Sequence, residues 1–165
     1  MKSINIFCFG FGQVAKNFIE KINREKIDIN LSTTSRQKTN IRKFDQINYT
    51  SYQLNEDNFD QEIKEKIKNS DYILISIPPI KGTDLVIKNF SKEIENCSAK
   101  WMTYLSATSV YGDHNGEWVD EESVTKPTSL SGITRLKAEK SWISLAKDKN
   151  ISLQVFRLSG IYSNN

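Results

Sequence analysis

The chain contains 165 residues, which is enough for one domain with its own hydrophobic core and short for two. Its 38% hydrophobic and 26% charged residues are typical of a globular protein, and no segment of the sequence approaches the ~18 apolar residues of a membrane span. Its net charge of +3 is too small to indicate nucleic-acid binding, so we expect a single domain over residues 1–165 with neither a membrane nor a nucleic acid as partner.

Short apolar segments rich in β-branched and aromatic residues alternate with helical patterns along the chain. This alternation predicts βαβ units around a parallel sheet. The predicted strands cover residues 3–9, 27–34, 47–54, 71–77, 100–107 and 151–158. The predicted fold is therefore an α/β, three-layer, Rossmann-like, doubly wound parallel sheet.

The segments between these strands carry apolar residues three or four positions apart, which predicts helices that pack on the sheet. The three clearest stripes are Val14, Phe18 and Ile22, then Phe59, Ile63 and Ile67, then Val86, Phe90 and Ile94. A further helix is predicted after Pro127, through Ala146. The connection between the second and third predicted strands is basic, and we expect it to hold only a short helix.

A glycine turn follows the first predicted strand, in the sequence GFGQVA. Gly10 permits a tight turn, Gly12 lets the backbone approach a pyrophosphate, and Ala15 allows the helix to pack closely on the strand. The free N–H groups and positive dipole of the helix start would bind the phosphates. The pattern predicts a dinucleotide site that contains Gly10, Phe11, Gly12, Gln13 and Val14.

The second predicted strand ends in the sequence STTSRQK. Sites that prefer NAD usually have Asp or Glu here, to bind the ribose 2′-hydroxyl. This chain instead has Thr34, Ser35 and Arg36, whose hydroxyls and guanidinium suit a 2′-phosphate. An ordinary surface arginine is the alternative interpretation. We predict NADP as the cofactor, with NAD less favoured.

The fourth predicted strand ends in Ile77, Pro78 and Pro79. In a doubly wound sheet the carboxyl end of this strand lies beside the cofactor, so we include the three residues in the predicted cofactor site. The two prolines would stiffen the backbone that passes the adenosine ribose. They could equally serve only to end the strand, because proline cannot extend the hydrogen-bonded ladder.

The cysteines and the histidine favour a cytoplasmic protein without a metal site. Cys8 and Cys97 lie far apart and outside any CxxC pair, as expected of buried thiols in a reducing compartment. The apolar run after Lys2 contains two glycines and lacks a convincing signal-peptide cleavage site. His114, the single histidine, lies in the glycine-flanked sequence GDHNGE, which is typical of a solvated turn. We predict a cytoplasmic location and no bound metal.

From residue 1 to about residue 163 the sequence resembles the extended or atypical short-chain dehydrogenase/reductase family, of the NAD-dependent epimerase/dehydratase type. The resemblance rests on four segments, GFGQVA, LSATSVYGDHNGEWVDE, SGITRLKAE and FRLSGIYS. It implies a Rossmann fold, a nicotinamide dinucleotide cofactor and an oxidoreductase or epimerase activity on a small molecule that the sequence does not identify. We add Ser106 to the predicted cofactor-binding residues.

The same resemblance implies a Ser or Thr, a Tyr and a Lys as catalytic residues, and this chain departs at all three positions. Ala107 takes the place of the Ser or Thr, Ser131 that of the Tyr, and Arg135 that of the Lys. A serine hydroxyl is a poor general base at neutral pH, and arginine does not exchange protons. Standard tyrosine-dependent hydride transfer is therefore not expected.

Thr108, Tyr111 and Arg135 are the catalytic candidates that remain. Thr108 offers a hydroxyl one residue beyond Ala107, Tyr111 offers a phenol near the site, and Arg135 could hold ribose or phosphate. For Tyr111, the alternative is an aromatic residue that packs the loop.

Two functions stay open at this point. The first is an NADP-dependent oxidoreductase or epimerase-like enzyme with a rearranged acid/base. The second is a catalytically silent NADP-binding sensor or interaction module. Members of the resembled family usually have roughly a hundred further residues that complete the substrate pocket. Two alternatives follow: a C-terminally truncated form, or a minimal domain that borrows a lid from a partner. A homodimer is the assembly we consider.

Overall fold

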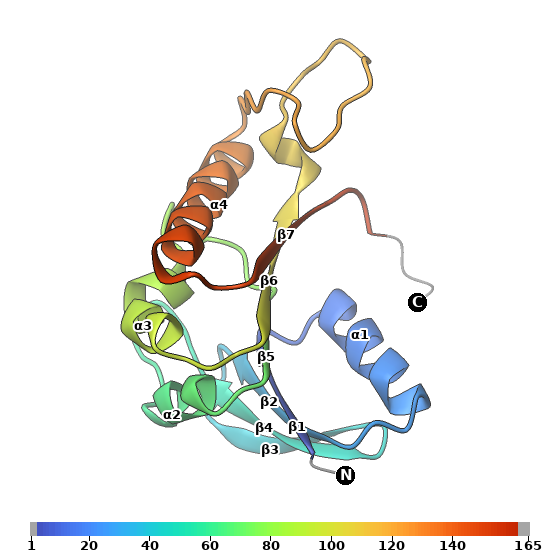
Figure 1. The fold of residues 1–165 in the computed structure, drawn as a ribbon, viewed down its shortest axis with the longest axis vertical. Helices are drawn as coiled ribbons and strands as arrows, with labels where there is room; N and C mark the ends of the chain where they lie inside the picture. The colour runs from blue at the N-terminus through green and yellow to red at the C-terminus, as the bar shows by residue number, and fades with distance from the viewer. Residues whose placement is uncertain (1–2, 162–165) are drawn as a thin grey trace.

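The computed structural model describes residues 3–161, which form one seven-stranded sheet with the strand order β3-β4-β2-β1-β5-β6-β7 (Figure 1). The ends of the predicted domain and of the family resemblance, residues 1–2 and 162–165, lie outside the described residues. The strands are β1 (Ile4–Phe9), β2 (Ile29–Ser35), β3 (Asn40–Phe44), β4 (Ile47–Gln53), β5 (Tyr72–Ile75), β6 (Trp101–Ala107) and β7 (Leu153–Leu158). The helices are α1 (Gln13–Arg24), α2 (Glu62–Lys68), α3 (Leu85–Glu95) and α4 (Leu130–Lys149), and a 3-10 turn, η1 (Thr108–Val110), follows β6.

The topology is that of a doubly wound sheet, which confirms the predicted fold class. β1 pairs in parallel with β2 on one side and with β5 on the other, so the strand order reverses at β1. α1 covers one face of the sheet, and α2, α3 and α4 cover the opposite face (Figure 1). Ligands of such sheets bind outside the carboxyl ends of the strands at the point of reversal. The glycine turn after β1 lies at that point.

The basic connection after β2 forms a strand, so the prediction of a short helix is wrong. β3 pairs antiparallel with β4 at the edge of the sheet, and Asp45, with φ of 52°, turns the chain between them. Phe44 of β3 packs against Phe11 of the glycine turn, with ring centroids 5.4 Å apart. A hairpin that buries Phe44 leaves the basic side chains at an exposed edge, where charge discourages pairing with another chain.

Two hydrophobic clusters hold the helices to the sheet. Toward α2, α3 and α4, the residues of the second and third predicted stripes are fully buried, except Phe59, which is partly buried. On α1 the most buried residues are Ala15 and Ile19, and the predicted Val14, Phe18 and Ile22 flank them. Each fully buried Ile or Phe contributes about 1.5–3 kcal/mol. The helices are thus fixed by apolar packing, which leaves the carboxyl ends of the strands for other contacts.

Close backbone contacts fix the start of α4 against η1. Ser129 caps the helix by accepting a hydrogen bond from the Gly132 N–H at 3.1 Å. A Cβ on Gly132 would lie 2.5 Å from the Ser109 carbonyl oxygen, so only glycine allows this approach. The contact sets the register of α4 relative to β6, and it therefore determines where Arg135 lies.

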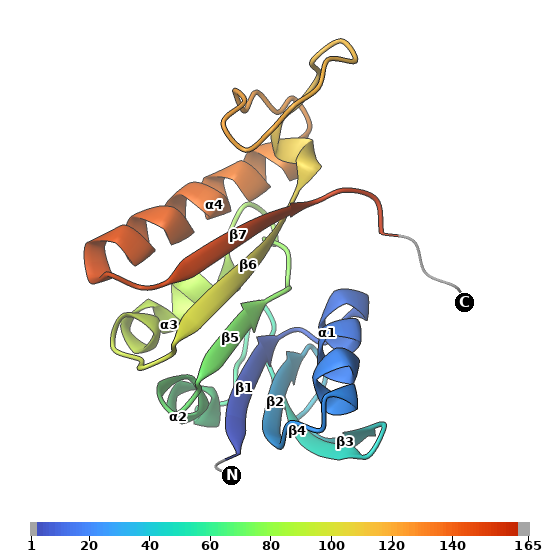
Figure 2. The same cartoon turned by 45° about the vertical axis from the view of Figure 1, so that its right-hand side comes forward.

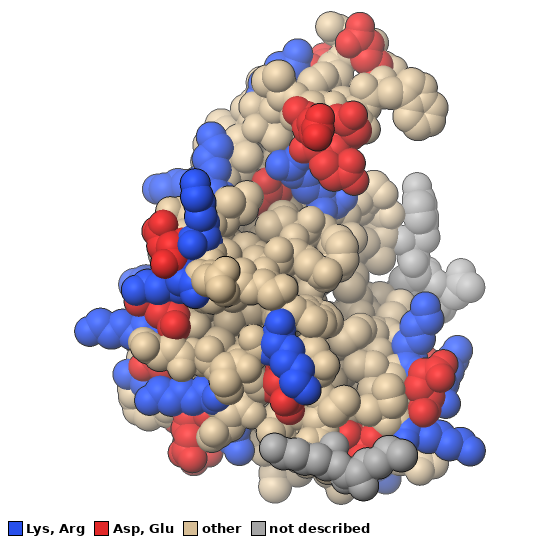
Figure 3. Space-filling model, in the orientation of Figure 1, with Lys and Arg blue, Asp and Glu red and all other residues tan. Residues whose placement is uncertain are grey.

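A long loop over residues 112–127 connects η1 to α4 and projects beyond the sheet (Figure 2). Gly112 and Lys126 form an isolated bridge that closes the base of the loop. Acidic side chains gather at this end of the molecule, whereas Lys and Arg side chains spread over the helical side (Figure 3). Trp118 lies on this loop with its side chain fully exposed.

Candidate functional site

The first glycine of the turn is required by the fold itself. Gly10 has φ of +83°, and a Cβ there would lie 2.7 Å from the Cγ2 of Ile77 and 2.9 Å from the Oγ of Ser76. The Gly10 N–H donates a 2.9 Å hydrogen bond to the Oγ1 of Thr34. The turn is therefore fixed between the ends of β2 and β5.

The second glycine has no such role in the described residues. A Cβ on Gly12 would meet nothing within 4 Å, and its φ of −83° is open to any residue. Gly12 is the N-cap of α1 and provides no side-chain cap, so the first N–H groups of the helix face open space. This arrangement leaves room for a group that accepts hydrogen bonds.

The predicted residues around the turn have different environments. Phe11 packs inward, with its ring centroid 5.0 Å from that of Tyr49, so its side chain supports the turn. Gln13 is exposed, and its side-chain amide donates to Asn17 at 3.1 Å. Val14 packs at the edge of the core. Gln13 and Val14 both line the cavity that opens beside Gly12.

At the end of β2 the three predicted residues also separate. Thr34 is 3% exposed and its hydroxyl accepts the Gly10 N–H. The Oγ of Ser35 is buried without a hydrogen-bond partner. Arg36 is exposed, and its guanidinium makes no ion pair with any residue in the range 3–161. Ser35 and Arg36 thus keep unused polar groups at this end of the sheet, while Thr34 stabilises the turn.

At the end of β5, Ile77 lies against Gly10, Pro78 is exposed and Pro79 is partly exposed. The structure thus brings the predicted residues from β1, β2 and β5 to one edge of the sheet.

A cavity of about 260 Å³ opens beside the glycine turn, and we call it the glycine-turn cavity. It joins residues that are far apart in the sequence, because the carboxyl ends of β1, β5, β6 and β7 meet there. Its lining consists of Gly12, Gln13, Val14, Ser76, Leu105, Ser106, Ala107, Arg135, Leu158, Ser159 and Ile161. Ser131, at the position of the family's tyrosine, is exposed and does not line this cavity.

Arg135 enters the glycine-turn cavity from α4. Its Nη1 donates a 2.8 Å hydrogen bond to the carbonyl oxygen of Leu105, which holds the guanidinium at the end of β6. Ser106 follows Leu105, is 3% exposed, and its Oγ has no hydrogen-bond partner. Burial raises the pKa of the neighbouring Tyr104 above its usual value, so this phenol is not a base at neutral pH.

Thr108 and Tyr111 line a different cavity of about 520 Å³, the edge cavity, beside β7. Tyr111 is buried, and the guanidinium carbon of Arg157 lies 4.8 Å from the centre of its ring. Arg157 forms a 3.0 Å ion pair with Glu139, and its pKa is raised mainly by hydrogen bonding to that carboxylate. The structure does not bring Thr108 and Tyr111 together with Arg135 and the glycine turn in one cavity. It favours the interpretation that Tyr111 packs the loop.

The sequence reasoning missed two buried carboxylates that organise this end of the molecule. Glu139 lies in the SGITRLKAE segment and is 1% exposed. Asp84 caps α3, where it accepts from the backbone of Val86 and Ile87 and from Nε1 of Trp142. In the sequence both look like ordinary polar residues at or within a predicted helix. Only Glu139, eight residues after Ser131 in the SGITRLKAE segment, lies where a role near the site could have been suspected.

The glycine-turn cavity can bind and orient a ligand, and its lining contributes no proton-exchanging side chain within residues 3–161. Arg135 is the one ionisable residue in the lining, and it stays charged. The described residues contain no group of three or more His, Cys, Asp or Glu that could hold a metal ion. No helix in the described part of the chain is both long and apolar enough to cross a membrane.

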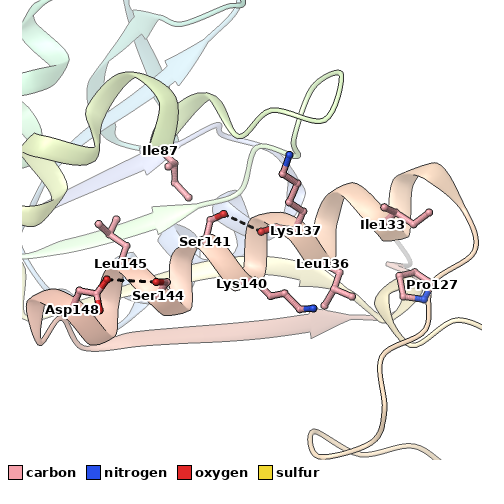
Figure 4. A pocket seen from close by; sticks show the side chains of 10 residues that line it. All are labelled: Ile87, Pro127, Ile133, Leu136, Lys137, Lys140, Ser141, Ser144, Leu145 and Asp148. Atoms are coloured by element: carbon pink, nitrogen blue, oxygen red, sulfur yellow. Dashed lines mark hydrogen bonds between the residues drawn. The ribbon is translucent and has the colours of Figure 1, made fainter.

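A third cavity, of about 810 Å³, lies between α3 and α4 on the far side from α1 (Figure 4). Ile87 of α3 and apolar side chains of α4 line it, with Asp148 near one end, Pro127 and Ile133 near the other, and Lys140 between them (Figure 4). None of its lining residues belongs to the predicted cofactor site. This groove is a separate surface of the molecule.

No protein-family model matches the chain, and no curated protein sequence matches it significantly. Solved structures do match. A functionally unknown conserved protein from Silicibacter pomeroyi is 27% identical with a TM-score of 0.76, over 97% of this chain and 54% of that one. The UDP-glucuronic acid 4-epimerase from Bacillus cereus, in complex with NAD, is 14% identical with a TM-score of 0.74, over 96% of this chain and 58% of that one.

The UDP-N-acetylglucosamine 4-epimerase from Bacillus cereus is also 14% identical with a TM-score of 0.74, over 99% of this chain and 63% of that one. The chain thus has the fold of the UDP-sugar 4-epimerase structures, which confirms the fold implied by the sequence resemblance to the extended short-chain dehydrogenase/reductase type. It spans between 54% and 63% of the length of these three neighbours.

Proposed function

We propose that the chain binds a nicotinamide dinucleotide over the glycine turn, as part of an oxidoreductase or epimerase-like protein, and that the cofactor is NADP. The observation that carries this proposal is the open space at Gly12. The fold needs Gly10 for its backbone conformation and for a close contact, but it needs nothing from Gly12. A residue without a Cβ at the bare start of α1 is what a bound pyrophosphate requires.

The preference for NADP rests on the end of β2. Arg36 is exposed and unpaired, and Ser35 has an unused hydroxyl, so both can serve a 2′-phosphate. A carboxylate, which would bind the 2′-hydroxyl of NAD and repel a phosphate, is absent from the sequence between residues 29 and 44. Several structures of an epimerase neighbour, the UDP-glucuronic acid 4-epimerase, are in complex with NAD, so the cofactor preference is a property in which this chain would differ from that protein.

Proton transfer is not part of what these residues supply. Ser131 is exposed, Ala107 has no hydroxyl, and Arg135 does not exchange protons at neutral pH. When bound, the dinucleotide would supply hydride transfer, and the described residues would bind and orient it. The second reading, a catalytically silent NADP-binding sensor, is supported by the same lining of the glycine-turn cavity.

The experiment is a calorimetric titration of the wild type, Arg36→Glu and Lys43→Glu with NADPH and with NADH. Lys43→Glu is the control, because it makes the same change of charge at an exposed residue of β3. Lys43 pairs with Asn48 of β4. We expect wild type and Lys43→Glu to prefer NADPH, and Arg36→Glu to lose about tenfold or more in NADPH affinity. No binding of either nucleotide to the wild type would contradict the proposal, and equal effects of the two substitutions would contradict the role of Arg36.

For the assembly we propose a homodimer through the groove between α3 and α4. Ile133 at one end of this groove is 47% exposed, and Lys140 and Asp148 lie eight residues apart on α4. In an antiparallel pair of α4 helices each lysine would face the partner's aspartate. Sedimentation velocity should show a dimer that Lys140→Glu weakens and that Lys140→Glu with Asp148→Lys restores. A monomeric wild type at all concentrations would contradict this assembly.

A further inference from the structure

We propose that Ser106 and Arg135 form an oxyanion-binding pair in the glycine-turn cavity, so that the group bound at the end of β6 is a phosphate or a carboxylate. This inference deepens the proposed function, because it assigns a ligand chemistry to the side of the cavity that lies opposite the glycine turn. It rests on one fixed positive charge, one unsatisfied hydroxyl and the chemistry of the whole lining.

The positive charge of Arg135 has no counter-ion among residues 3–161. Its guanidinium is held by a neutral carbonyl, that of Leu105, and no carboxylate oxygen lies within 4.0 Å of it. The charge of Arg135 does lower the pKa of one buried acid, Asp84. That carboxylate forms no ion pair with Arg135, and its oxygens already accept from two backbone N–H groups and from Trp142. A partly buried guanidinium without a paired anion favours the binding of one.

The hydroxyl of Ser106 supplies the second donor. The residue is 3% exposed, and its Oγ has no hydrogen-bond partner in the structure. The other serine at this depth of the cavity, Ser76, donates to the carbonyl oxygen of Phe9 and is therefore occupied. A buried hydroxyl without a partner lowers stability unless a ligand or water satisfies it. Ser106 is thus available to a ligand that also reaches Arg135.

The rest of the cavity suits an anion as well. Its lining contains no carboxylate, and the open first turn of α1 presents backbone N–H groups from the opposite wall. A guanidinium fork matches the oxygens of a phosphate or carboxylate, in two parallel hydrogen bonds, better than it matches a single neutral hydroxyl. The oxyanion can come from the phosphates of the cofactor or from a separate acidic small molecule.

The test is a titration of the protein without nucleotide with pyrophosphate and with malonate, followed by calorimetry or by NMR of arginine Nε–H groups. The variants are Arg135→Gln and Ser106→Ala, with Lys137→Gln as the control. Lys137 lies on the same helix, is exposed, and does not line the glycine-turn cavity. We expect Arg135→Gln to weaken anion binding by about tenfold or more and Ser106→Ala by about threefold to tenfold. Lys137→Gln should bind like the wild type.

A second titration at saturating NADPH distinguishes the two sources of the oxyanion. Loss of anion binding in the presence of NADPH would assign the pair to the phosphates of the cofactor. Retained binding would assign it to a separate acid. Anion binding that is absent from the wild type, or unchanged in both Arg135→Gln and Ser106→Ala, would overturn the proposal. Because the first titration uses no nucleotide, a failure of NADPH to bind would count against the proposed function and leave this result readable.

Discussion

The two cavities at the carboxyl end of the sheet differ in how their polar groups are satisfied. In the glycine-turn cavity, the hydroxyl of Ser106 has no partner and Arg135 has only a carbonyl. In the edge cavity, Arg157 donates to both oxygens of Glu139 and to the carbonyl of Glu121, and it covers the ring of Tyr111. One set of groups is open to a ligand, and the other is closed on itself.

This difference favours Arg135, rather than Thr108 or Tyr111, as the candidate residue that contacts a ligand. Volume alone would favour the edge cavity, which is the larger of the two at about 520 Å³. Unsatisfied buried polar groups are rare in folded proteins, and where they occur they call for a partner. We therefore expect the edge cavity to stabilise the fold and the glycine-turn cavity to bind the ligand. Two substitutions, one in each cavity, test this division.

The largest effect is expected in the edge cavity, from Glu139→Ala. The side chain of Glu139 is 1% exposed and that of Arg157 is 20% exposed, so this is a largely buried ion pair. The substitution would leave the guanidinium of Arg157 without its counter-ion. Breaking such a buried pair costs about 3–5 kcal/mol. Urea unfolding would measure the loss. The control is Glu20→Ala, which breaks the exposed Arg24–Glu20 pair and should cost less than about 1 kcal/mol.

Ser106→Ala extends this prediction to the glycine-turn cavity. Removing a hydroxyl without a partner should leave the free energy of unfolding unchanged or raise it. If Glu139→Ala and Ser106→Ala were equally destabilising, the division between a structural and a ligand-binding cavity would be wrong.

The next effect separates the two glycines of the turn. Gly10→Ala combines a positive φ with a contact at 2.7 Å, and should cost about 2–4 kcal/mol of stability. Gly12→Ala places its methyl group in open space at a permitted φ, so it should leave stability unchanged or raise it by about 0.5 kcal/mol. It should still weaken NADPH binding by about tenfold or more, because the methyl group occupies the space of the pyrophosphate.

Thermal unfolding and a nucleotide titration on both variants would measure these effects. A stable Gly12→Ala protein with wild-type NADPH affinity would show that the open space at residue 12 is not used by the cofactor. A stable Gly10→Ala protein would contradict the steric account of the turn.

The sequence predicted the six parallel strands to within two residues at each end, because several are nearly continuous apolar runs and the others are rich in β-branched and aromatic residues. It did not predict β3, because the basic residues of NIRKF are not typical of a strand. In the structure β3 places the partly buried Phe44 against Phe11. The edge position of β3 depends on β4, and such a pairing between segments is not visible in local composition.

The glycine turn was predicted because its conformation depends on the backbone of consecutive residues. The separation of Tyr111 from Arg135 could not be predicted in the same way. It depends on Arg157, which lies 46 positions after Tyr111 in the sequence. Arg157 forms an ion pair with Glu139 and packs its guanidinium over the ring of Tyr111. Likewise, the position of Thr34 at the end of the second strand predicted a contact with the cofactor. In the structure its hydroxyl accepts a hydrogen bond from the Gly10 N–H.

The smallest effect concerns Asp84, a buried carboxylate that, unlike Glu139, is held by neutral donors. Burial raises its pKa, and the N–H groups of Ile87 and Val86, the indole of Trp142 and, least of these, the charge of Arg135 oppose that rise. A carboxyl whose pKa is higher in the folded than in the unfolded state stabilises the fold when it is protonated. Its contribution is therefore complete below about pH 4, the unfolded value, and is lost as the pH rises through the folded value.

Asp84→Asn should remove this pH dependence while the amide oxygen keeps the cap of α3. Its amide nitrogen cannot accept from Nε1 of Trp142, so we also expect a loss of about 1–3 kcal/mol that does not vary with pH. Urea unfolding of both proteins across the acidic range measures the difference. We expect the wild type to lose stability relative to Asp84→Asn as the pH rises. A difference that grows in the opposite direction would mean that the fold favours the charged carboxylate, and that Asp84 resembles Glu139 in being balanced by a cation. Arg135 would then have a counter-ion in Asp84, and the contrast between the two cavities would be weaker than their hydrogen bonds indicate.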